Sequence, residues 1–278
     1  MKQKRRNGEF HHKHSLGQNF IEDEVLLDQL ADLSLIGPED CVLEIGPGFG
    51  ALTKPIAKRA KRVVSLEIDQ TLLPILHVTL EQFKNASVIL GDVMKTDLAK
   101  LVSEVFSNEP SLRVAANLPY YITTDVLMKL LFELPQAKSI AVMIQKEVGD
   151  KLLSQPGEDG YGPLAILCQY YCEVTRALDV PAACFTPPPK VDSSFMILVK
   201  RESRAFPETD EKTFLKLVKG AFLMRRKTLV NNLISCFSMD REKATHCLEE
   251  AQIDIQARAE SLSISDFCHL ARILSEDK

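Results

Sequence analysis

Residues 41–50 have the sequence CVLEIGPGFG, a strand-like run followed by three glycines. Residues 41–45 have the length and composition of a buried strand, and a helical pattern begins at about Ala51. Gly46 and Gly48 lack a Cβ, so the turn between strand and helix lets the backbone approach a ligand closely. A simple tight turn would use the same residues. The segment nevertheless favours the first strand and ligand-binding turn of an open α/β sheet.

From about residue 40 to 145, strand-like runs alternate with helical stretches. The runs that precede or connect the helical stretches are residues 41–45, 63–66, 87–90, 113–116 and 140–144. This alternation predicts a parallel sheet with helices on both faces, whose ligands bind beyond the carboxyl ends of the strands. Two later runs, 173–180 and 195–199, are joined by a proline-rich loop and can pair antiparallel at the sheet edge. We therefore predict an α/β fold with a mostly parallel sheet of seven strands.

The chain changes character near residue 204. Residues 202–207 are polar, and the sequence beyond them has helical patterning, with neither glycine nor proline after Gly220. We therefore expect three parts: an N-terminal segment over residues 1–21, an α/β domain over 22–203 and a small helical domain over 204–278.

Composition excludes several classes of protein. The 278 residues are 45% hydrophobic and 26% charged, as in ordinary soluble globular proteins. No run approaches the roughly 18 apolar residues that span a membrane, and no apolar stretch follows the charged N-terminus. We therefore expect a cytoplasmic protein without a membrane partner. The seven cysteines have no CxxC spacing and the histidines form no zinc pattern with them, so we expect neither a disulfide framework nor a protein-bound metal.

Basic residues are concentrated in two places, although the net charge is −4. Residues 1–14 hold five lysines and arginines and one acid. The second group consists of Lys212, Lys216, Lys219, Arg225, Arg226 and Lys227. Local basic patches on an acidic protein fit contact with nucleic-acid phosphates, and a solvated basic surface is the alternative.

Two acidic residues stand at the ends of successive strands. Glu67 ends the second strand, 21 residues after Gly46, where a carboxylate can accept hydrogen bonds from both ribose hydroxyls of a nucleotide-like cofactor. Asp92 follows the third strand, where it can accept from the adenine amine, although Asp at a strand end is often only a turn former. Glu67 alone does not distinguish NAD from S-adenosylmethionine. The glycine turn, Glu67 and Asp92 together favour S-adenosylmethionine.

The sequence Asn117-Leu118-Pro119-Tyr120 follows the fourth strand, at the same predicted edge of the sheet. The exocyclic amine of adenine is a poor nucleophile because its lone pair is delocalised into the ring. The Asn117 side-chain oxygen and the Leu118 carbonyl can accept the amine hydrogens and favour a pyramidal nitrogen. Pro119 stiffens the turn, and Tyr120 offers an aromatic face for a base taken out of its stack. These four residues are the predicted catalytic residues, and a core tyrosine beside a proline turn is the alternative.

With these residues in place, the sequence resembles the ribosomal RNA adenine dimethyltransferase family, over nearly the whole chain. Besides the motifs above, the resemblance rests on residues 16–20 (LGQNF), 145–148 (QKEV), 185–194 and 225–229 (RRKTL). It implies a Rossmann-like class I methyltransferase domain, S-adenosylmethionine as the cofactor and a C-terminal helical domain that faces the ribosome. The cofactor-binding residues that it implies are Asn19, Ile21, Gly46, Gly48, Glu67, Asp92 and Asn117.

The resemblance also implies a substrate. The family's product is a pair of adjacent dimethylated adenosines near the 3′ end of 16S rRNA, which links the activity to ribosome biogenesis. Tyr120 and Phe185 would pack against the flipped base, and Arg225, Arg226 and Lys227 would contact RNA. The expected partner is 16S rRNA in the 30S subunit or its precursor, and we expect a monomer.

Three alternatives remain at this stage. A DNA adenine methyltransferase would need a sequence-reading element that we do not find. An assembly or transcription factor could keep the fold without turnover, but the intact Asn117, Pro119 and Tyr120 argue against lost catalysis. An NAD-dependent dehydrogenase lacks any group of residues suited to hydride transfer.

Overall fold

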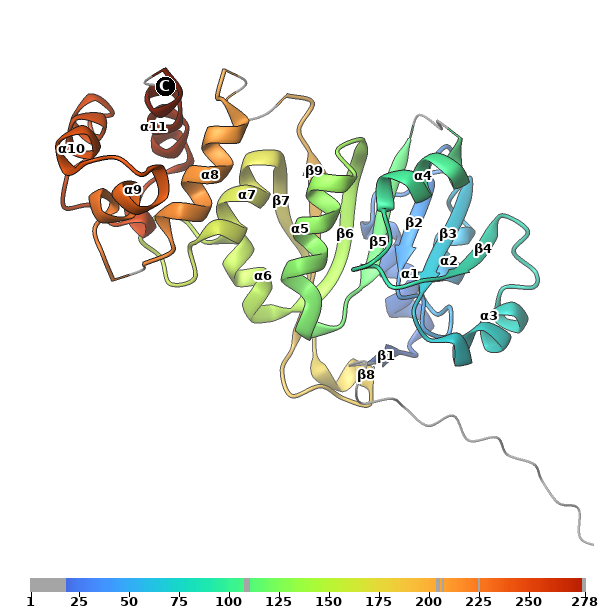
Figure 1. The fold of residues 1–278 in the computed structure, drawn as a ribbon. Helices are drawn as coiled ribbons and strands as arrows, with labels where there is room; N and C mark the ends of the chain where they lie inside the picture. The colour runs from blue at the N-terminus through green and yellow to red at the C-terminus, as the bar shows by residue number, and fades with distance from the viewer. Residues whose placement is uncertain (1–18, 108–110, 204–205, 207, 225, 277–278) are drawn as a thin grey trace, which may run out of the picture.

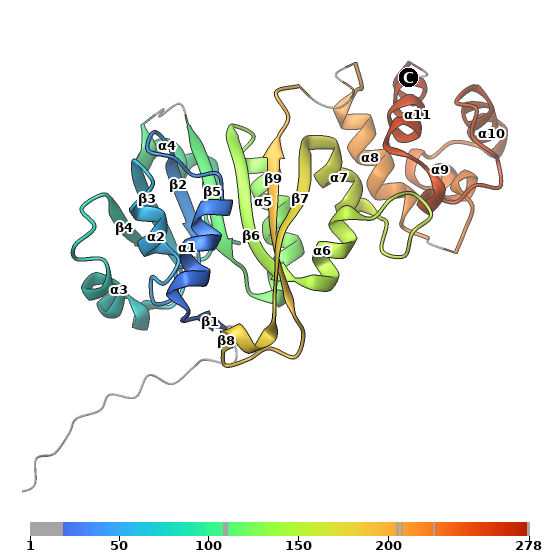
Figure 2. The ribbon, with the colours of Figure 1, turned by 180° about the vertical axis from the view of Figure 1, so that it is seen from behind.

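The strands lie side by side in one sheet with helices on both faces (Figures 1 and 2). The computed structural model describes residues 19–107, 111–203, 206, 208–224 and 226–276. The seven strands of the sheet are β2 (Cys41–Ile45), β3 (Arg62–Glu67), β4 (Ala86–Leu90), β5 (Leu112–Asn117), β6 (Ala137–Gln145), β7 (Cys172–Val180) and β9 (Ser193–Lys200). The prediction of a mostly parallel seven-stranded sheet is confirmed.

The strand order is β4-β3-β2-β5-β6-β9-β7, and only β9 runs antiparallel to its neighbours. The chain passes from β2 outward through β3 to β4, and then returns to the other side of β2 as β5. The strand order reverses between β2 and β5. The connections that follow these two strands therefore run in opposite directions, which leaves a crevice at the carboxyl ends of β2 and β5.

Two helical layers bury the sheet. The helices packed on it or beside it are α1 (Glu24–Leu33), α2 (Thr53–Ala57), α3 (Leu73–Thr79), α4 (Leu98–Phe106), α5 (Thr123–Glu133), α6 (Lys146–Leu153) and α7 (Pro163–Tyr171). Apolar residues of α4 to α7 share one core cluster with one face of the sheet. Those of α1 and α2 cover the other face. The central strands β2, β3, β5, β6 and β9 are therefore largely buried on both sides, which explains their continuous apolar runs, whereas the edge strands β4 and β7 are partly exposed.

A second, two-stranded sheet joins the start of the described chain to the proline-rich loop. β1 (Phe20–Ile21) pairs antiparallel with β8 (Phe185–Thr186), and the following Thr186–Pro187 peptide is cis. Both strands lie near the carboxyl ends of the sheet strands (Figure 1). This pairing brings residues 19–21 to the edge where the sequence predicts ligand binding.

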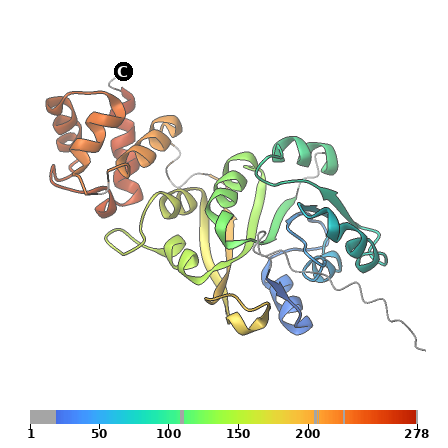
Figure 3. The ribbon, with the colours of Figure 1, turned by 60° about the horizontal axis from the view of Figure 1, so that its bottom comes forward.

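The C-terminal part is helical. It contains α8 (Glu211–Ala221), α9 (Leu229–Phe237), α10 (Arg241–Glu250) and α11 (Ile264–Glu276), beside α7 (Figure 3). Short 3-10 turns occur at η2 (Gln70–Leu72), η3 (Tyr120–Ile122), η4 (Ala182–Cys184) and η5 (Ala259–Ser261). The side chains of Asp210 and Asp240 accept backbone hydrogen bonds at the starts of α8 and α10, as expected of N-caps.

The hydrophobic core of these helices extends into α7. Tyr161, Ile166 and Tyr170 are buried in the same cluster as the apolar faces of α8 to α11. The ring of Tyr170 stacks on Phe214 with centroids 4.2 Å apart, and the Tyr161 hydroxyl donates to the Leu262 carbonyl. The helical part is thus packed onto the α/β part through α7.

All seven cysteines are free, and five of them are buried. No helix in the described ranges is long and apolar enough to cross a membrane. Among those same residues, His, Cys, Asp and Glu form no cluster that could hold a metal ion.

Candidate active site

A pocket that is partly open to solvent lies at the carboxyl ends of β2, β3 and β5. Residues from four separate segments line it: Asn19, Phe20, Gly46, Gly48, Glu67, Ile68, Asn117, Leu118, Pro119 and Tyr120. All four predicted catalytic residues are among them, as are the predicted cofactor residues Asn19, Gly46, Gly48 and Glu67. The structure therefore brings the glycine turn, the strand-end acid and the Asn117–Tyr120 turn into one pocket.

The glycine turn has a backbone conformation that favours glycine. Gly46 and Gly48 have φ angles of +70° and +58°, in the left-handed region. A Cβ on Gly48 would lie 2.6 Å from the ring of Phe20, which packs over the turn. The Phe20 ring in turn contacts Phe49, with centroids 4.4 Å apart. Absence of a side chain at Gly48 is thus what allows the β1 segment to close on the pocket.

Glu67 holds the glycine turn from beneath. Its side chain accepts hydrogen bonds from the backbone N–H groups of Gly48 (3.2 Å) and Asp69 (2.8 Å), and only 3% of the residue is exposed. Burial raises the pKa of Glu67, while these two backbone hydrogen bonds act in the opposite direction. Each carboxylate oxygen has two acceptor positions, so Glu67 retains the capacity to bind ligand hydroxyls.

The turn after β5 is fixed at both ends. The Leu118 N–H donates to the Met143 carbonyl at 3.1 Å, and the Pro119 carbonyl accepts from the backbone N–H of Ile122. Asn117 donates through Nδ2 to the Asn19 carbonyl at 3.1 Å. Within the described residues, neither Asn117 Oδ1 nor the Leu118 carbonyl accepts a hydrogen bond. Two acceptors in the pocket are therefore available to a ligand.

Tyr120 is half-buried beside these acceptors. Its hydroxyl lies 2.7 Å from Oγ of Ser193, a hydrogen bond in which either group can donate. Burial raises the pKa of Tyr120, and the negative charge of Asp192 adds to this effect, against the hydrogen bond from Ser193. The phenol therefore stays protonated at neutral pH and offers a ring face rather than a base.

Other predicted site residues lie outside the pocket lining. Ile21 and Phe185 are buried together in the cluster beneath β1 and β8, and Phe185 does not line the pocket with Tyr120. Asp92 accepts a hydrogen bond from the Met94 N–H, as a turn-forming aspartate does, and its other oxygen is 3.6 Å from the Lys95 ammonium. The cofactor and base contacts predicted for these three residues stay predictions, and Ile21 lines an adjoining pocket together with Gly46 and Asn117.

Two of the predicted RNA-contacting residues, Arg226 and Lys227, are exposed in the turn between α8 and α9. Arg225 and residues 1–18 lie outside the described residues, so the predictions made for them have no structural counterpart.

Three residues of the site escaped the sequence-based prediction. Phe20 and Ile68 line the pocket, and Ser193 bonds to Tyr120. Ile68 is half-exposed directly after the strand-end acid, and an apolar residue in that position was a usable signal. Phe20 and Ser193 lie in segments that carry the family resemblance, 16–20 and 185–194, but their own contacts depend on distant parts of the chain.

The pocket combines a buried carboxylate, the backbone of a glycine turn, two available acceptors and an aromatic ring. Such a site can hold a nucleoside-like cofactor and a planar base with an amine, and it has no group suited to hydride transfer. Together with the strand order, these features define a Rossmann-like methyltransferase. The family model described as ribosomal RNA adenine dimethylase matches residues 9–276, and the chain belongs to this family.

Relatives of known name agree with this assignment. The chain is 47% identical over 268 residues to the ribosomal RNA small subunit methyltransferase A of Bacillus mycoides, covering 95% of this chain and 92% of the relative. The protein of the same name from Bacillus cereus has the same identity and coverage. The crystal structure of a dimethyladenosine transferase from Plasmodium falciparum matches with a TM-score of 0.77 and 26% identity, covering 92% of this chain and 98% of that one.

The protein is therefore an enzyme, a methyltransferase that uses S-adenosylmethionine. Family membership removes the dehydrogenase alternative and disfavours a DNA substrate.

Proposed function

We propose that this enzyme dimethylates two adjacent adenosines near the 3′ end of 16S rRNA, within the 30S subunit or its precursor. The observation that carries the proposal is the pair of available acceptors, Asn117 Oδ1 and the Leu118 carbonyl, beside the Tyr120 ring in the pocket that also contains Glu67. The names of the Bacillus relatives support ribosomal RNA of the small subunit as the substrate.

The residues present fit S-adenosylmethionine. Glu67 would hold the ribose hydroxyls with its spare acceptor positions, and the backbone at Gly46 and Gly48 would lie against the cofactor. Asn19 and Phe20 would cover it. Asp92, whose carboxylate accepts from the Met94 N–H in this structure, would accept from the adenine amine of the cofactor. When bound, the cofactor supplies a methyl group on a positively charged sulfur.

Activation of the amine falls to the Asn117–Tyr120 turn. Asn117 Oδ1 and the Leu118 carbonyl would each accept one amine hydrogen, which favours a pyramidal nitrogen with a localised lone pair. The amine nitrogen held by these two acceptors would take the methyl group that the bound cofactor supplies, and the methylated, cationic nitrogen would release its proton to solvent. No strong base is needed, because the methylated nitrogen is acidic. Catalysis then rests on alignment and on acceptors that need not reorganise.

The second methyl transfer to each adenine starts from an amine that already has one methyl group. After one methylation the amine has a single hydrogen, so only one of the two acceptors can still be engaged. The pocket must then accommodate a methyl group where the other hydrogen was. We therefore expect Asn117 and Leu118 to act together in the first transfer and singly in the second.

The remaining parts of the chain would bind the substrate. We propose that residues 22–203 form the methyltransferase domain, that residues 1–21 close over the cofactor, and that residues 204–278 contact ribosomal RNA. The exposed Arg226 and Lys227, with Arg225, would bind phosphates. We further propose that the enzyme acts as a monomer in the cytoplasm, and that Phe185 supports the wall of the base pocket from within the core.

The decisive experiment measures dimethyladenosine in small-subunit RNA. Cells with and without this protein are compared by mass spectrometry of the 3′-terminal fragment of 16S rRNA. Cells that lack the protein should lose both dimethylated adenosines, and expression of the wild-type chain, but not of the Asn117→Ala variant, should restore them. Retention of both in the deletion strain would refute the proposal. Growth rescue by Asn117→Ala without methylation would indicate an assembly factor instead.

A further inference from the structure

Two neighbouring serines at the start of β9 have different surroundings. Ser193 and Ser194 are both completely buried. Successive side chains of a strand point to opposite faces of a sheet. Phe195 and Ile197, on the face of Ser193, pack in the cluster that includes α1, and Met196, on the face of Ser194, packs in the cluster that includes α4 to α7.

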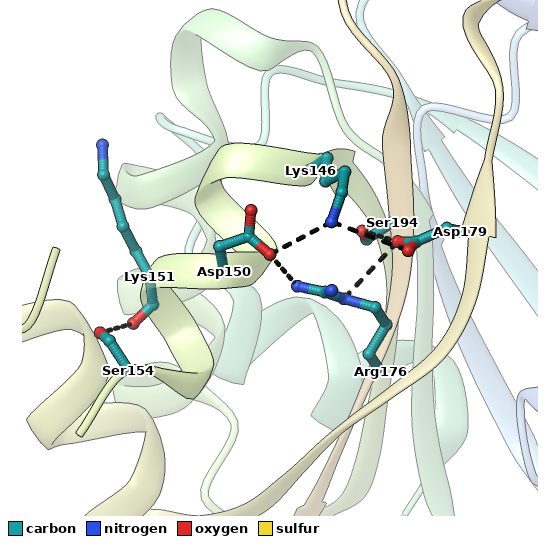
Figure 4. A network of polar contacts seen from close by, with 7 residues as sticks. All are labelled: Lys146, Asp150, Lys151, Ser154, Arg176, Asp179 and Ser194. Carbon is teal, nitrogen blue, oxygen red and sulfur yellow. Dashed lines mark hydrogen bonds and ion pairs between the residues drawn. The ribbon is translucent and has the colours of Figure 1, made fainter. Parts of the chain in front are cut away.

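Ser194 belongs to a charged network on its face (Figure 4). Its hydroxyl donates to Asp179, whose carboxylate lies 3.7 Å from the Lys146 ammonium and 3.6 Å from Nε of Arg176. Lys146 and Arg176 also pair with Asp150, so that α6, β7 and β9 are joined by two cations and two anions. Desolvation acts to raise the pKa of the Asp150 carboxyl, but the neighbouring Arg176 and Lys146 together lower it. Ser194 therefore helps to fasten three elements together.

Ser193 makes a different contact. Its hydroxyl meets the Tyr120 hydroxyl at 2.7 Å. The Ser193 backbone is fixed on both sides, since the residue is in register with Gln145 of β6 and with Val180 of β7. A hydroxyl at this position is thus a rigid anchor for whatever it binds.

Tyr120 needs such an anchor. It stands in a short 3-10 turn and is only half-buried, so packing alone leaves its ring less constrained than a core side chain. The phenol oxygen lies on the long axis of the ring, and a hydrogen bond there fixes the direction of that axis. The partner comes from the strand that follows the proline-rich loop, so the contact also ties this loop to the turn after β5.

We infer that Ser193 is a positioning residue for methyl transfer, which holds the Tyr120 ring in place against the target adenine. This inference rests on the proposed role of Tyr120 in the base pocket. Ser194, one residue away and equally buried, has a structural role only. The two serines therefore offer a matched pair in which the same substitution removes the same hydroxyl from the same strand.

The experiment compares Ser193→Ala with Ser194→Ala. The kcat and KM for adenine methylation are measured on small subunits that lack the dimethyl groups, together with the Kd for S-adenosylmethionine and the melting temperature. Ser193→Ala should lower kcat roughly three- to tenfold, as expected for one lost hydrogen bond, with cofactor affinity unchanged. Ser194→Ala should lower the melting temperature at least as much and leave kcat within about twofold of wild type.

Tyr120→Phe tests the same bond from the other side and keeps the ring. It should lower kcat by about the same factor as Ser193→Ala, and the double variant should be no slower than either single variant, because only one interaction is lost. Full activity of Ser193→Ala, or losses that multiply in the double variant, would overturn the inference while the proposed function stands. Absence of adenine methylation by the wild-type enzyme would overturn the proposed function, and this inference with it.

Discussion

At the scale of single residues, Asn117 has two separate hydrogen-bonding groups with different partners. Its Nδ2 group donates to the Asn19 carbonyl, which ties the β5 turn to the segment that covers the pocket. Its Oδ1 remains available for a ligand amine. Since the amide is held by the first bond, the acceptor is oriented before the substrate arrives, which is the condition under which an acceptor contributes most to a transition state.

Replacement of Asn117 by alanine should therefore separate binding from chemistry. We expect Asn117→Ala to keep the Kd for S-adenosylmethionine within several-fold of wild type and to slow methyl transfer by about 100-fold or more. Calorimetry and single-turnover transfer measure the two quantities. Asn85→Ala is the control. Asn85 directly precedes β4, at the opposite edge of the sheet, and donates to the carbonyls of Ala57 and Ala60. Undiminished transfer by Asn117→Ala would remove its proposed role.

Also at the residue scale, the buried carboxyl of Glu44 makes the free energy of unfolding depend on pH. It is fully buried in β2 and accepts hydrogen bonds from Thr53 (2.7 Å) and Ser65 (2.6 Å). Burial raises its pKa to about 7, against these two bonds. The folded state thus holds the proton more tightly than the unfolded chain, whose Glu44 has the ordinary value of 4.5. This contribution to stability is complete below the unfolded pKa and is lost as the pH rises to about 7.

Glu44→Gln, which mimics the protonated acid, should lack this dependence. Relative to wild type, the variant should gain stability between about pH 4.5 and pH 7, by about 3 kcal/mol at most, and the difference should be constant at higher pH. Urea denaturation at a series of pH values measures it. Asp40→Asn should behave oppositely, because hydrogen bonds from Ser111 and Arg113 outweigh burial and lower the pKa of Asp40. A difference between Glu44→Gln and wild type that is independent of pH would contradict this account.

At the scale of elements, the crossing of α8 and α9 depends on a missing side chain. A Cβ on Gly220 would lie 2.1 Å from Sγ of Cys236 and 2.6 Å from its Cβ. The two helices therefore approach more closely than any larger residue at position 220 allows. Gly220 is also the last glycine of the chain.

Gly220→Ala should accordingly destabilise the protein, although alanine is the better helix former by about 1 kcal/mol. We expect a net loss of about 1–3 kcal/mol, because overpacking forces the helices apart. The melting temperature measures the effect. Adding Cys236→Ala should recover part of the loss, since it removes the nearer atom, Sγ, and leaves the Cβ contact. If Gly220→Ala alone stabilised the protein, α8 and α9 could move apart without a loss of free energy, which would contradict this account.

At the scale of the whole molecule, the enzyme has a net charge of −4 and yet exposes a basic turn. Binding of RNA phosphates releases counterions, so affinity falls with salt in proportion to the contacts made. Arg226 and Lys227 are exposed in the turn between α8 and α9, in the part of the chain proposed to contact ribosomal RNA.

Charge reversal at these two positions should weaken binding to small subunits and flatten its salt dependence. For Arg226→Glu with Lys227→Glu, we expect the slope of log K against log salt to decrease in magnitude by about 1–2. The matched control is Lys84→Glu with Lys138→Glu, two exposed lysines at the amino-terminal edge of the sheet, away from the pocket. Equal slopes for wild type and the turn variant would assign Arg226 and Lys227 to surface solvation.

The sequence by itself determined which segments form the seven strands of the main sheet, with ends that differ by up to three residues from those observed, because the periodicity of apolar residues is a local property. Since parallel strands end at one edge, the sequence also placed Gly46, Glu67 and Asn117 in one pocket. The family followed from the same motifs.

Only the tertiary structure decided which distant residues meet. Phe20 packs over Gly48, Ser193 bonds to Tyr120, Phe185 is buried beneath the edge rather than in the pocket, and α7 shares its core with the C-terminal helices. The physical reason is that each contact joins segments far apart in the chain. Such contacts depend on the simultaneous packing of every element between them, and no local pattern of residues specifies that packing.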